Sequence, residues 1–299
     1  MAPSEPTPTH DARAADALHG FVARHPRLLV LSGAGLSTAS GIPGYRDETG
    51  AWRGRQPIQL KEFLGSTLAR QRYWARSLHG WPVVAQAAPN PAHYALARLA
   101  EAGHVRQLVT QNVDGLHQRA GSGDVIELHG NIGQVICLAC RTNHARADIQ
   151  AVLVAENPHF AERAAARSAE PAPDGDADLE VENFETFRIP TCRNCGGMLK
   201  PDVVFFGENV PLERVDAARR ALEQADALLV VGSSLMVFSG YRFCVLASQW
   251  GKPIAAVNLG HTRADPLLSL KVRQPCSEAL TGLLERLGLG QKAGAVLDA

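Results

Sequence analysis

The segment 110–140 contains three kinds of side chain that could do chemistry. The run Gln111-Asn112-Val113-Asp114 carries amides and a carboxylate, His129 follows, and the pair Cys137-x-x-Cys140 comes last. Amides can hydrogen-bond sugar hydroxyls or an ordered water, and a carboxylate can accept from a carboxamide. A histidine near its ordinary pKa of about 6.5 can act as a general base. The Asn-x-Asp-Gly run is also typical of a tight turn.

A second segment with chemical potential is the glycine-rich run Ser32-Gly33-Ala34-Gly35-Leu36-Ser37, which follows the apolar run 28–31. Such a turn after a buried strand lets backbone N–H groups approach a pyrophosphate. Thr38 occupies the place of the third glycine in a G-x-G-x-x-G fingerprint, so an ordinary strand-to-helix turn is the alternative. Combined with the polar residues at 111–114, the run indicates an enzyme that uses a nucleotide.

Four of the six cysteines form two CxxC pairs, Cys137/Cys140 and Cys192/Cys195. Such pairs favour zinc over disulfides, and four thiolates leave no open coordination position. Tripling a loop length costs only about 1 kcal/mol of closure entropy, whereas structural zinc contributes roughly 10–16 kcal/mol in small peptides. We therefore predict one structural zinc ion despite the long spacer. A redox site would need a thioredoxin-like helix start, which neither pair has.

Apolar runs that end in small or polar residues predict the parallel strands that position these groups. Ligands bind at the carboxyl ends of such strands, so the strand ends should share one crevice. His129 is the one histidine that this pattern places beside a strand end, although a histidine that merely caps a strand is the alternative. The expected strands are 28–31, 105–110, 125–128, 227–231 and 253–257; the expected helices between them include 12–25, 212–224 and 243–249.

The predicted fold class is α/β, a Rossmann-like doubly wound parallel sheet with a small zinc-binding domain and a helical insertion. Residues 46–81 hold a predicted helix at 58–78 and a lid entrance at 47–50. The cysteine insertion holds a predicted helix at 146–167 and an acidic loop at 170–185. We assign residues 1–46, 90–136 and 204–299 to a nucleotide-binding domain, 47–89 to the lid and helical insertion, and 137–203 to the zinc-binding domain.

Composition excludes several classes of protein. The chain has 299 residues, 45% hydrophobic and 20% charged, which is typical of a globular protein. Its 30 basic and 30 acidic residues balance, which argues against a nucleic-acid partner. No apolar run approaches the roughly 18–20 residues of a membrane span, and the first residues are unlike a signal peptide. We expect a cytoplasmic monomer that binds neither nucleic acid nor membrane.

Six blocks, in order along residues 28–276, resemble the sirtuins, a family of NAD-dependent protein deacylases. The segments 201–208 and 233–242 and the long cysteine spacer resemble the class II branch, which contains the mitochondrial lipoamidase-type enzyme. Gly44 departs from the family pattern, which usually has Asp there. The six blocks are Gly33 to Arg46, Thr110 to His117, His129-Gly130, the two CxxC pairs, Phe205 to Glu208 and Val231 to Ser234.

The resemblance implies NAD as cofactor, one structural zinc ion and acylated protein or peptide substrates. In the family reaction the acyl oxygen attacks the nicotinamide ribose, nicotinamide leaves, and a histidine, here His129, deprotonates the ribose so that the acyl group moves to ADP-ribose. Asn112 and Asp114 complete the catalytic set. The implied NAD contacts are Gly33, Ala34, Gly35, Ser37, Thr38, Tyr45, Arg46, Trp52, Gln111, Asn112, Val113, Asp114, His129, Gly232, Ser233, Ser234, Asn258, Leu259, Gly260 and Cys276.

The substrate peptide is expected to add as a strand between 204–207 and 236–240, so that main-chain hydrogen bonds bind it with little sequence selectivity. The implied substrate contacts are Val204, Phe205, Phe206, Gly207, Val237 and Phe238. Sirtuins that remove acidic acyl groups carry a Tyr-x-x-Arg pair, and Ala51-Trp52-Arg53-Gly54-Arg55 lacks the Tyr, which disfavours desuccinylation. Two alternatives stay open: a protein mono-ADP-ribosyltransferase, and a weakly catalytic NAD-sensing protein suggested by Gly44.

Overall fold

The computed structural model describes residues 10–47, 51–53, 56–166 and 183–290, with the side chains of 10–12 and 164–166 left out. Most of the predicted lid entrance, together with Gly54, Arg55 and residues 170–182 of the acidic loop, lies outside the described residues.

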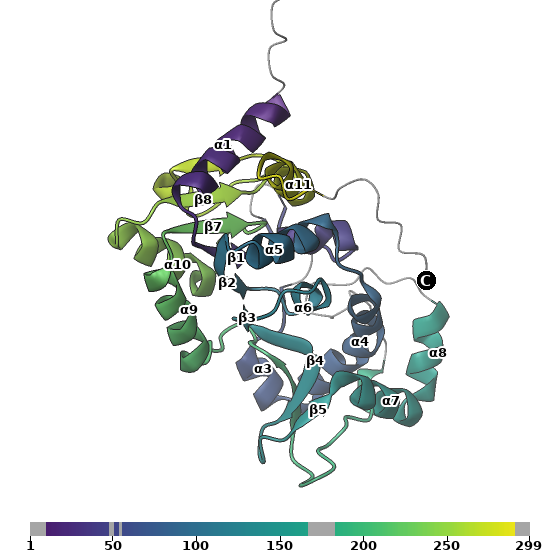
Figure 1. The fold of residues 1–299 in the computed structure, drawn as a ribbon. Coiled ribbons are helices and arrows are strands. Elements are labelled where there is room, and N and C mark those ends of the chain that lie inside the picture. The colour runs from purple at the N-terminus through teal and green to yellow at the C-terminus, as the bar shows by residue number, and fades with distance from the viewer. Residues whose placement is uncertain (1–9, 48–50, 54–55, 167–182, 291–299) are drawn as a thin grey trace, which may run out of the picture.

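A six-stranded parallel sheet forms the larger part of the molecule (Figure 1). Its strand order is β3-β2-β1-β7-β8-β9, so the chain reverses its direction of winding between the neighbours β1 and β7. All five residues of β1 and of β7 are buried because helices cover both faces of the sheet. The strands are β1 (Leu28–Ser32), β2 (Val105–Thr110), β3 (Val125–Glu127), β7 (Ala227–Val231), β8 (Ile254–Val257) and β9 (Leu270–Val272).

Helices pack on both faces of this sheet, which confirms the doubly wound α/β prediction. On one face α1 (His10–Arg24), α5 (Pro91–Glu101) and α11 (Cys276–Arg286) share a core that includes Leu18, Leu96 and Leu280. On the other face α9 (Leu212–Gln224) and α10 (Phe238–Gln249) bury Leu222 and Phe243. The helix predicted at 243–249 begins five residues earlier than expected, since its first turn lacks an apolar period.

A smaller lobe lies at the bottom of Figure 1 and contains a three-stranded antiparallel sheet of order β5-β4-β6. Helices from the insertion at 60–86 and from the cysteine insertion share one core with this sheet, including Phe63, Trp74 and Leu153. The elements are β4 (Gly130–Cys137), β5 (Asn143–Ala145), β6 (Leu199–Val203), α3 (Leu60–Gly65), α4 (Thr67–Gln86), α7 (Arg146–Glu156) and α8 (Pro158–Ala166).

Two predicted long helices are each divided, so those two predictions are wrong in detail. The run 58–78 begins as a helix only at Leu60 and breaks at Ser66, whose Oγ accepts from the Ala69 N–H at 3.2 Å and so caps α4. The run 146–167 breaks at Asn157 because a residue before proline disfavours helical backbone. Asn157 then bonds both backbone groups of Arg188 and fixes the break.

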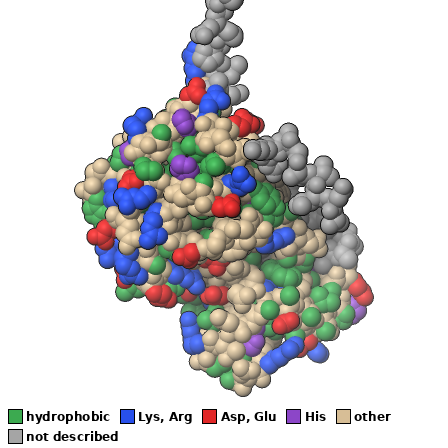
Figure 2. All heavy atoms as spheres, viewed as in Figure 1, with side chains coloured by type: hydrophobic (Ala, Val, Ile, Leu, Met, Phe, Trp, Pro, Cys, Tyr) green, Lys and Arg blue, Asp and Glu red, His purple; other side chains and the backbone are tan. Residues whose placement is uncertain are grey.

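Short helices complete the connections: α2 (Ala34–Ser37), α6 (Leu116–Arg119) and the 3-10 turns Thr38–Ser40, Phe184–Thr186 and Asp265–Leu267. Among the described residues, no helix combines the length and the apolar content that crossing a bilayer requires. The face in Figure 2 carries Lys and Arg interspersed with Asp and Glu, in keeping with the balanced charge of the chain.

Candidate functional site

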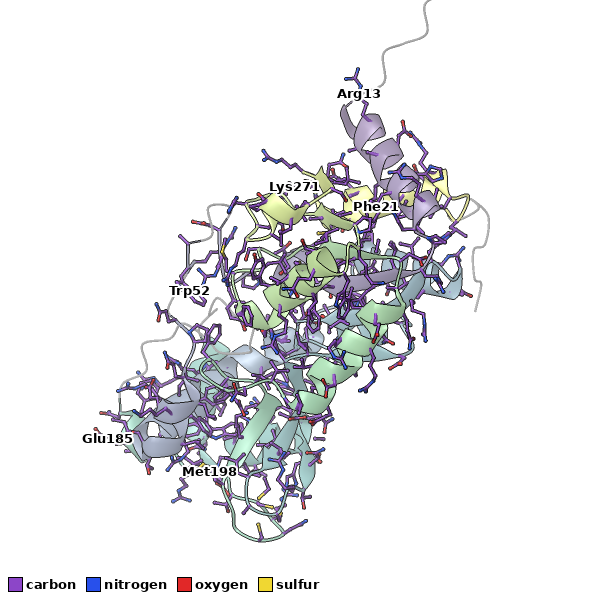
Figure 3. The ribbon with its side chains drawn as sticks, turned by 90° about the vertical axis from the view of Figure 1, so that its left-hand side faces the viewer. Arg13, Phe21, Trp52, Glu185, Met198 and Lys271 are labelled. Carbon is purple, nitrogen blue, oxygen red and sulfur yellow. The ribbon has the colours of Figure 1, made fainter. Side chains whose placement is uncertain are left out.

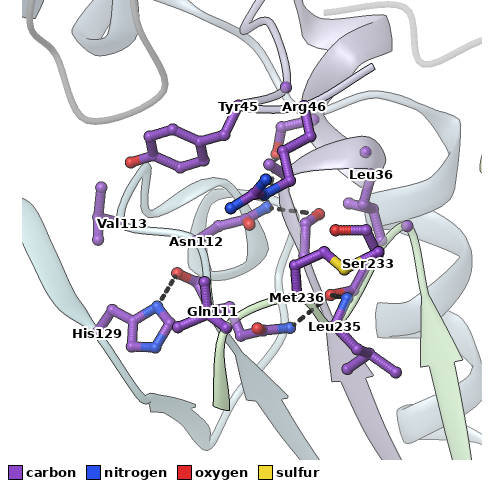
Figure 4. A pocket seen from close by; sticks show the side chains of 18 of the residues that line it. Leu36, Tyr45, Arg46, Gln111, Asn112, Val113, His129, Ser233, Leu235 and Met236 are labelled. Atoms are coloured by element: carbon purple, nitrogen blue, oxygen red, sulfur yellow. Dashed lines mark hydrogen bonds between the residues drawn. The ribbon is translucent and has the colours of Figure 1, made fainter. Parts of the chain in front are cut away.

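One cavity of about 610 Å³ opens at the carboxyl ends of β1, β2, β7 and β8, where the sheet reverses its winding. Every candidate side chain or backbone position other than the zinc cysteines lies on its wall. Four segments contribute most of the polar lining: 33–38, 111–114, 232–234 and 258–260. Figure 4 shows how Tyr45 and Arg46 face His129 across this cavity. The structure therefore brings together residues that are more than two hundred positions apart in sequence.

Gly33 and Gly35 bring the turns after β1 and β7 into contact, a role that their spacing alone does not predict. The Gly33 N–H donates to the Val231 carbonyl at 3.0 Å and the Gly35 N–H to the Gly232 carbonyl at 2.8 Å. A Cβ atom on Gly35 would lie 2.9 Å from the Gly232 oxygen, and Gly232 itself has a left-handed φ of +63°. These glycines thus let the turns after β1 and β7 touch, and their own N–H groups are not directed at a ligand.

Ser37 organises the amide and carboxylate cluster. Its hydroxyl donates to Asp114 Oδ2 at 2.7 Å and accepts from Asn112 Nδ2 at 3.0 Å. Asp114 Oδ1 accepts from the Leu116 N–H at 2.9 Å, so the turn interpretation of this run is correct. Burial raises the pKa of Asp114, although these hydrogen bonds oppose the effect. Asn112 and Asp114 are consequently held in fixed positions on the cavity wall.

His129 is neutral, and its tautomer follows from its contacts (Figure 4). Nδ1 lies 2.9 Å from the Gln111 carbonyl, which can only accept, so the proton is on Nδ1. Nε2 then accepts from the Ser239 hydroxyl at 2.7 Å. Burial lowers the pKa of His129 to about 4, helped by Arg214 and Arg242 and opposed by the Gln111 bond. The imidazole is a lone-pair acceptor, with a pKa below the ordinary value that the sequence suggested.

A second histidine, His117, also lies at strand ends, whereas the sequence pattern singled out His129 as the histidine beside a strand end and opposite the Asn112/Asp114 cluster. Its Nε2 is 2.8 Å from Ser32 Oγ, which donates to Thr110 Oγ1 at 2.9 Å. Burial, followed by the neighbouring His93, lowers the pKa of His117 to about 3. His117 escaped prediction because the one-turn helix α6 has no readable periodicity; its buried side chain contacts Ser32 and the ring of His93.

Three aromatic rings meet beside the cavity: Tyr45, Trp52 and Phe206, with centroids 5.6–6.3 Å apart. In Figure 3, Trp52 lies between the large sheet, where Lys271 is labelled, and the small lobe, where Met198 is labelled. The guanidinium of Arg46 lies 4.0 Å from the Trp52 ring centroid. Among the described residues, a Cβ atom on Gly44 would meet only the Arg46 carbonyl, at 3.5 Å. These neighbours therefore leave room for a side chain.

The two segments expected to hold the substrate line the same cavity. In segment 204–207 the Val204 N–H donates to the His129 carbonyl at 2.8 Å, and the Phe205 N–H donates to Glu208 Oε2 at 2.8 Å. Lys200 pairs with that carboxylate at 3.0 Å and anchors it. In the other segment Val237 and Phe238 are 40% and 56% exposed. Apolar side chains are thus presented to solvent beside the cavity.

The four zinc-ligand candidates converge at the tips of β4 and β6. Their Sγ atoms all lie within 4.8 Å of one another, and the pairs Cys137/Cys195 and Cys140/Cys192 are 3.5 and 3.7 Å apart. Zn–S bonds of about 2.3 Å in a tetrahedron place sulfurs about 3.8 Å apart, so the set fits Zn²⁺.

Comparison with known proteins identifies the family. The Sir2 family model matches residues 33–239. The chain belongs to the Sir2 family. This Sir2-family chain is 56% identical over 272 residues to a protein of Bordetella bronchiseptica, covering 90% of this chain and 98% of the relative. It is 56% identical to one of Xanthomonas campestris pv. campestris, covering 89% and 90%. Both relatives are named NAD-dependent protein deacetylase.

Solved structures of Sir2 proteins have the same fold as this Sir2-family chain. One, of Sir2 with a p53 peptide and NAD⁺, has a TM-score of 0.73 at 28% identity and covers 92% of this chain and 98% of its own. Another, of Sir2 bound to an acetylated peptide, has a TM-score of 0.72 at 28% identity, with coverage of 92% and 99%.

Proposed function

We propose that this Sir2-family chain is an NAD-dependent protein-lysine deacylase of the class II branch, which transfers the acyl group to ADP-ribose and releases nicotinamide. The observation that carries the proposal is the single cavity that joins a neutral His129, whose Nε2 lone pair can accept a proton, to the Asn112/Asp114 cluster and to the turns at 33–38 and 232–234. The names of its relatives in Bordetella and Xanthomonas support the same activity.

The nucleotide would lie along the strand ends, in the domain of residues 1–46, 90–136 and 204–299. Bound NAD supplies a ribose carbon from which nicotinamide can leave. The fixed carboxylate of Asp114 and the amide of Asn112 face this region and can hold a carboxamide and an ordered water or ribose hydroxyl. Nε2 of His129 takes the proton of a sugar hydroxyl, because its Nδ1 is committed to the Gln111 carbonyl.

The acyl-lysine substrate would enter between segments 204–207 and 236–240. It would add as a strand beside the non-helical residues 204–207 and 236–237, because residues 238–240 form the first turn of α10. The cavity wall nearest to them is apolar and includes Ile58, Val113 and Phe205. Behind Phe205 the buried rings of Phe63 and Tyr73 lie 5.2 and 5.3 Å away and close the space. This surface suits acetyl, longer acyl or lipoyl groups.

The decisive experiment measures nicotinamide release over peptides that carry acetyl, long-chain acyl, lipoyl or succinyl lysine. We expect release with the apolar acyl groups and a labelled acyl-ADP-ribose as a small-molecule product. Label from NAD that stays on protein would instead support the mono-ADP-ribosyltransferase. Binding of NAD with no release from any peptide would support the sensing protein and refute the proposal.

A further inference from the structure

Two arginines without an acidic partner lie beside the substrate segment 236–240. Arg242 is half-buried on α10 and lines the cavity, and Arg263 is exposed on the loop after β8. Within the described part of the chain, neither guanidinium has a carboxylate within ion-pair distance. The acidic residue nearest to Arg263 in sequence is Asp265, which already pairs with Lys271 at 2.7 Å and with His261 at 3.0 Å. Both positive charges are therefore uncompensated.

Aromatic rings hold these two arginines in place. Arg263 stacks on Tyr241, with 4.3 Å from Cζ to the ring centroid, and Arg242 lies 5.3 Å from the Phe238 centroid. The backbone N–H of Arg263 donates to the Ser234 carbonyl at 2.9 Å, which ties its loop to the substrate segment. Nη1 of Arg263 also donates to the Met236 carbonyl at 3.5 Å. Stacking and this bond preorganise the guanidinium, and its remaining N–H groups can donate to an oxygen acid. We call Phe238, Tyr241, Arg242 and Arg263 the cationic rim.

We propose that the cationic rim binds an acidic side chain of the substrate peptide close to the acyl-lysine. This inference rests on the proposed deacylase function, because it takes segment 236–240 as one wall of the peptide site. A peptide strand added beside residues 233–237, the non-helical stretch before α10, would run past Phe238 at the start of that helix and within reach of Arg263. The apolar ring receives the stem of a Glu residue, and the two guanidiniums receive its carboxylate. Main-chain recognition alone would give no such sequence preference.

The test compares peptides that differ only in one residue, Glu, Gln or Lys, placed in turn at each of the three positions before and after acetyl-lysine. At the best position we expect kcat/KM for Glu to exceed that for Gln by about three- to tenfold at low salt, with Lys below Gln. The ratio should approach one in about 0.5 M NaCl, since the charges are exposed. A ratio of one at every position in the wild-type protein would overturn the proposal.

Variants separate this role from a loss of folding. Arg263→Gln should lower the Glu/Gln ratio, and Arg263→Glu should invert the preference toward Lys peptides, an outcome that misfolding cannot produce. Arg220→Gln, an exposed arginine on α9, is the matched control and should keep the wild-type ratio. If Arg263→Gln instead raises KM for NAD at an unchanged ratio, the rim serves the nucleotide and the proposal is wrong.

The proposed function and the proposed role of the cationic rim can be refuted independently of each other. If no peptide gives nicotinamide release, the deacylase proposal fails, and binding of fluorescent Glu and Gln peptides, followed by anisotropy, still measures the rim. Tighter binding of the Glu peptide that is lost in Arg263→Gln supports the rim, and equal binding of both peptides refutes it.

Discussion

Nε2 of His129 lies 2.7 Å from Oγ of Ser239. Because the opposite ring nitrogen carries the proton, the Ser239 hydroxyl donates this hydrogen bond, in the way that a sugar hydroxyl would have to donate during proton abstraction. Ser239 therefore occupies the direction from which His129 can accept a proton. Two predictions follow from this pair of residues.

Replacing His129 by Ala should remove the general base. We expect kcat to fall by roughly 10²- to 10⁴-fold, while NAD binding measured by calorimetry changes little, since the turns at 33–38 and 232–234 are untouched. A wild-type rate of nicotinamide release in His129→Ala would contradict the assignment of this residue as the base.

Replacing Ser239 by Ala should alter the pH profile rather than abolish activity. A donor to Nε2 stabilises the neutral imidazole, so its loss should raise the pKa of His129 from its burial-lowered value toward the ordinary one. The acid limb of kcat/KM in the free enzyme should then move to higher pH. Ser248→Ala, on an exposed position at the other end of α10, is the control. An unmoved acid limb would show that Ser239 does not act on His129.

Strands buried on both faces were predictable from sequence, and less regular elements were not. The runs that form β1, β7 and β8 are buried along their whole length and almost entirely apolar, so their ends are placed within a residue or two. β2 is less regular, because Arg106 and Gln107 interrupt its apolar run. β9 is a three-residue edge strand, and glycines at 130 and 133 interrupt the pattern of β4. The breaks at Ser66 and Asn157 do have local signals, an N-cap serine and a residue before proline, but the longer helical pattern around them outweighs these signals.

The same limit applies to the cavity. Motif residues at strand ends were predictable as its lining because parallel strands bring their ends to one edge of the sheet. The partners of those residues depend on tertiary approach. Nothing local in the sequence places Ser239 against His129, or His117 against Ser32. The roles of Gly33 and Gly35 also became clear only with Gly232 packed against them.

Removal of zinc should unfold the small lobe. Cys137 and Cys192 are buried in the core shared by β4, β6 and the helices of the insertion, so loss of the metal exposes that core. We expect about one equivalent of zinc in the purified protein, and a lowered Tm with loss of activity after chelation or in Cys192→Ser. Cys244→Ala, which lies outside the cluster, should keep its zinc. Less than half an equivalent of zinc in a folded, active protein would exclude a structural site.

Stability should fall as the pH drops below about 6.5. Burial lowers the pKa of His93 and of His129 to about 4 and that of His117 to about 3. The unfolded chain therefore binds more protons than the folded one between pH 6.5 and these values, and each histidine reduces the free energy of unfolding by up to about 1.4 kcal/mol per pH unit.

Urea unfolding at pH 7 and pH 5.5 measures this slope. His117→Gln retains a donor toward Ser32 but does not titrate, so its slope should be smaller by one proton. His159→Gln, whose side chain in the native protein is 93% exposed, should leave the slope unchanged. Equal slopes for wild type and His117→Gln would show that His117 is not a buried neutral group.

Gly44→Asp should be tolerated. Of the residues that the structure describes, the added Cβ meets only the Arg46 carbonyl, at an ordinary contact distance, and the backbone at Gly44 is not left-handed. Replacing glycine restricts the unfolded chain, so we expect the free energy of unfolding to rise by about 0.4–1 kcal/mol, with nicotinamide release at least as fast as in wild type. A fall in stability in urea unfolding would mean that the position is more crowded than its contacts indicate.

The contact of Gly35 with Gly232 joins the turn after β1 to the turn after β7, two segments that are far apart in sequence. No local segment can form it, because each half lacks hydrogen-bond partners until β1 and β7 have docked. These paired turns should thus form late in folding, after a slow closure of the chain. A bound nucleotide would then favour the whole folded sheet over every partly assembled state, and protection of its central amides from hydrogen exchange should increase with NAD concentration.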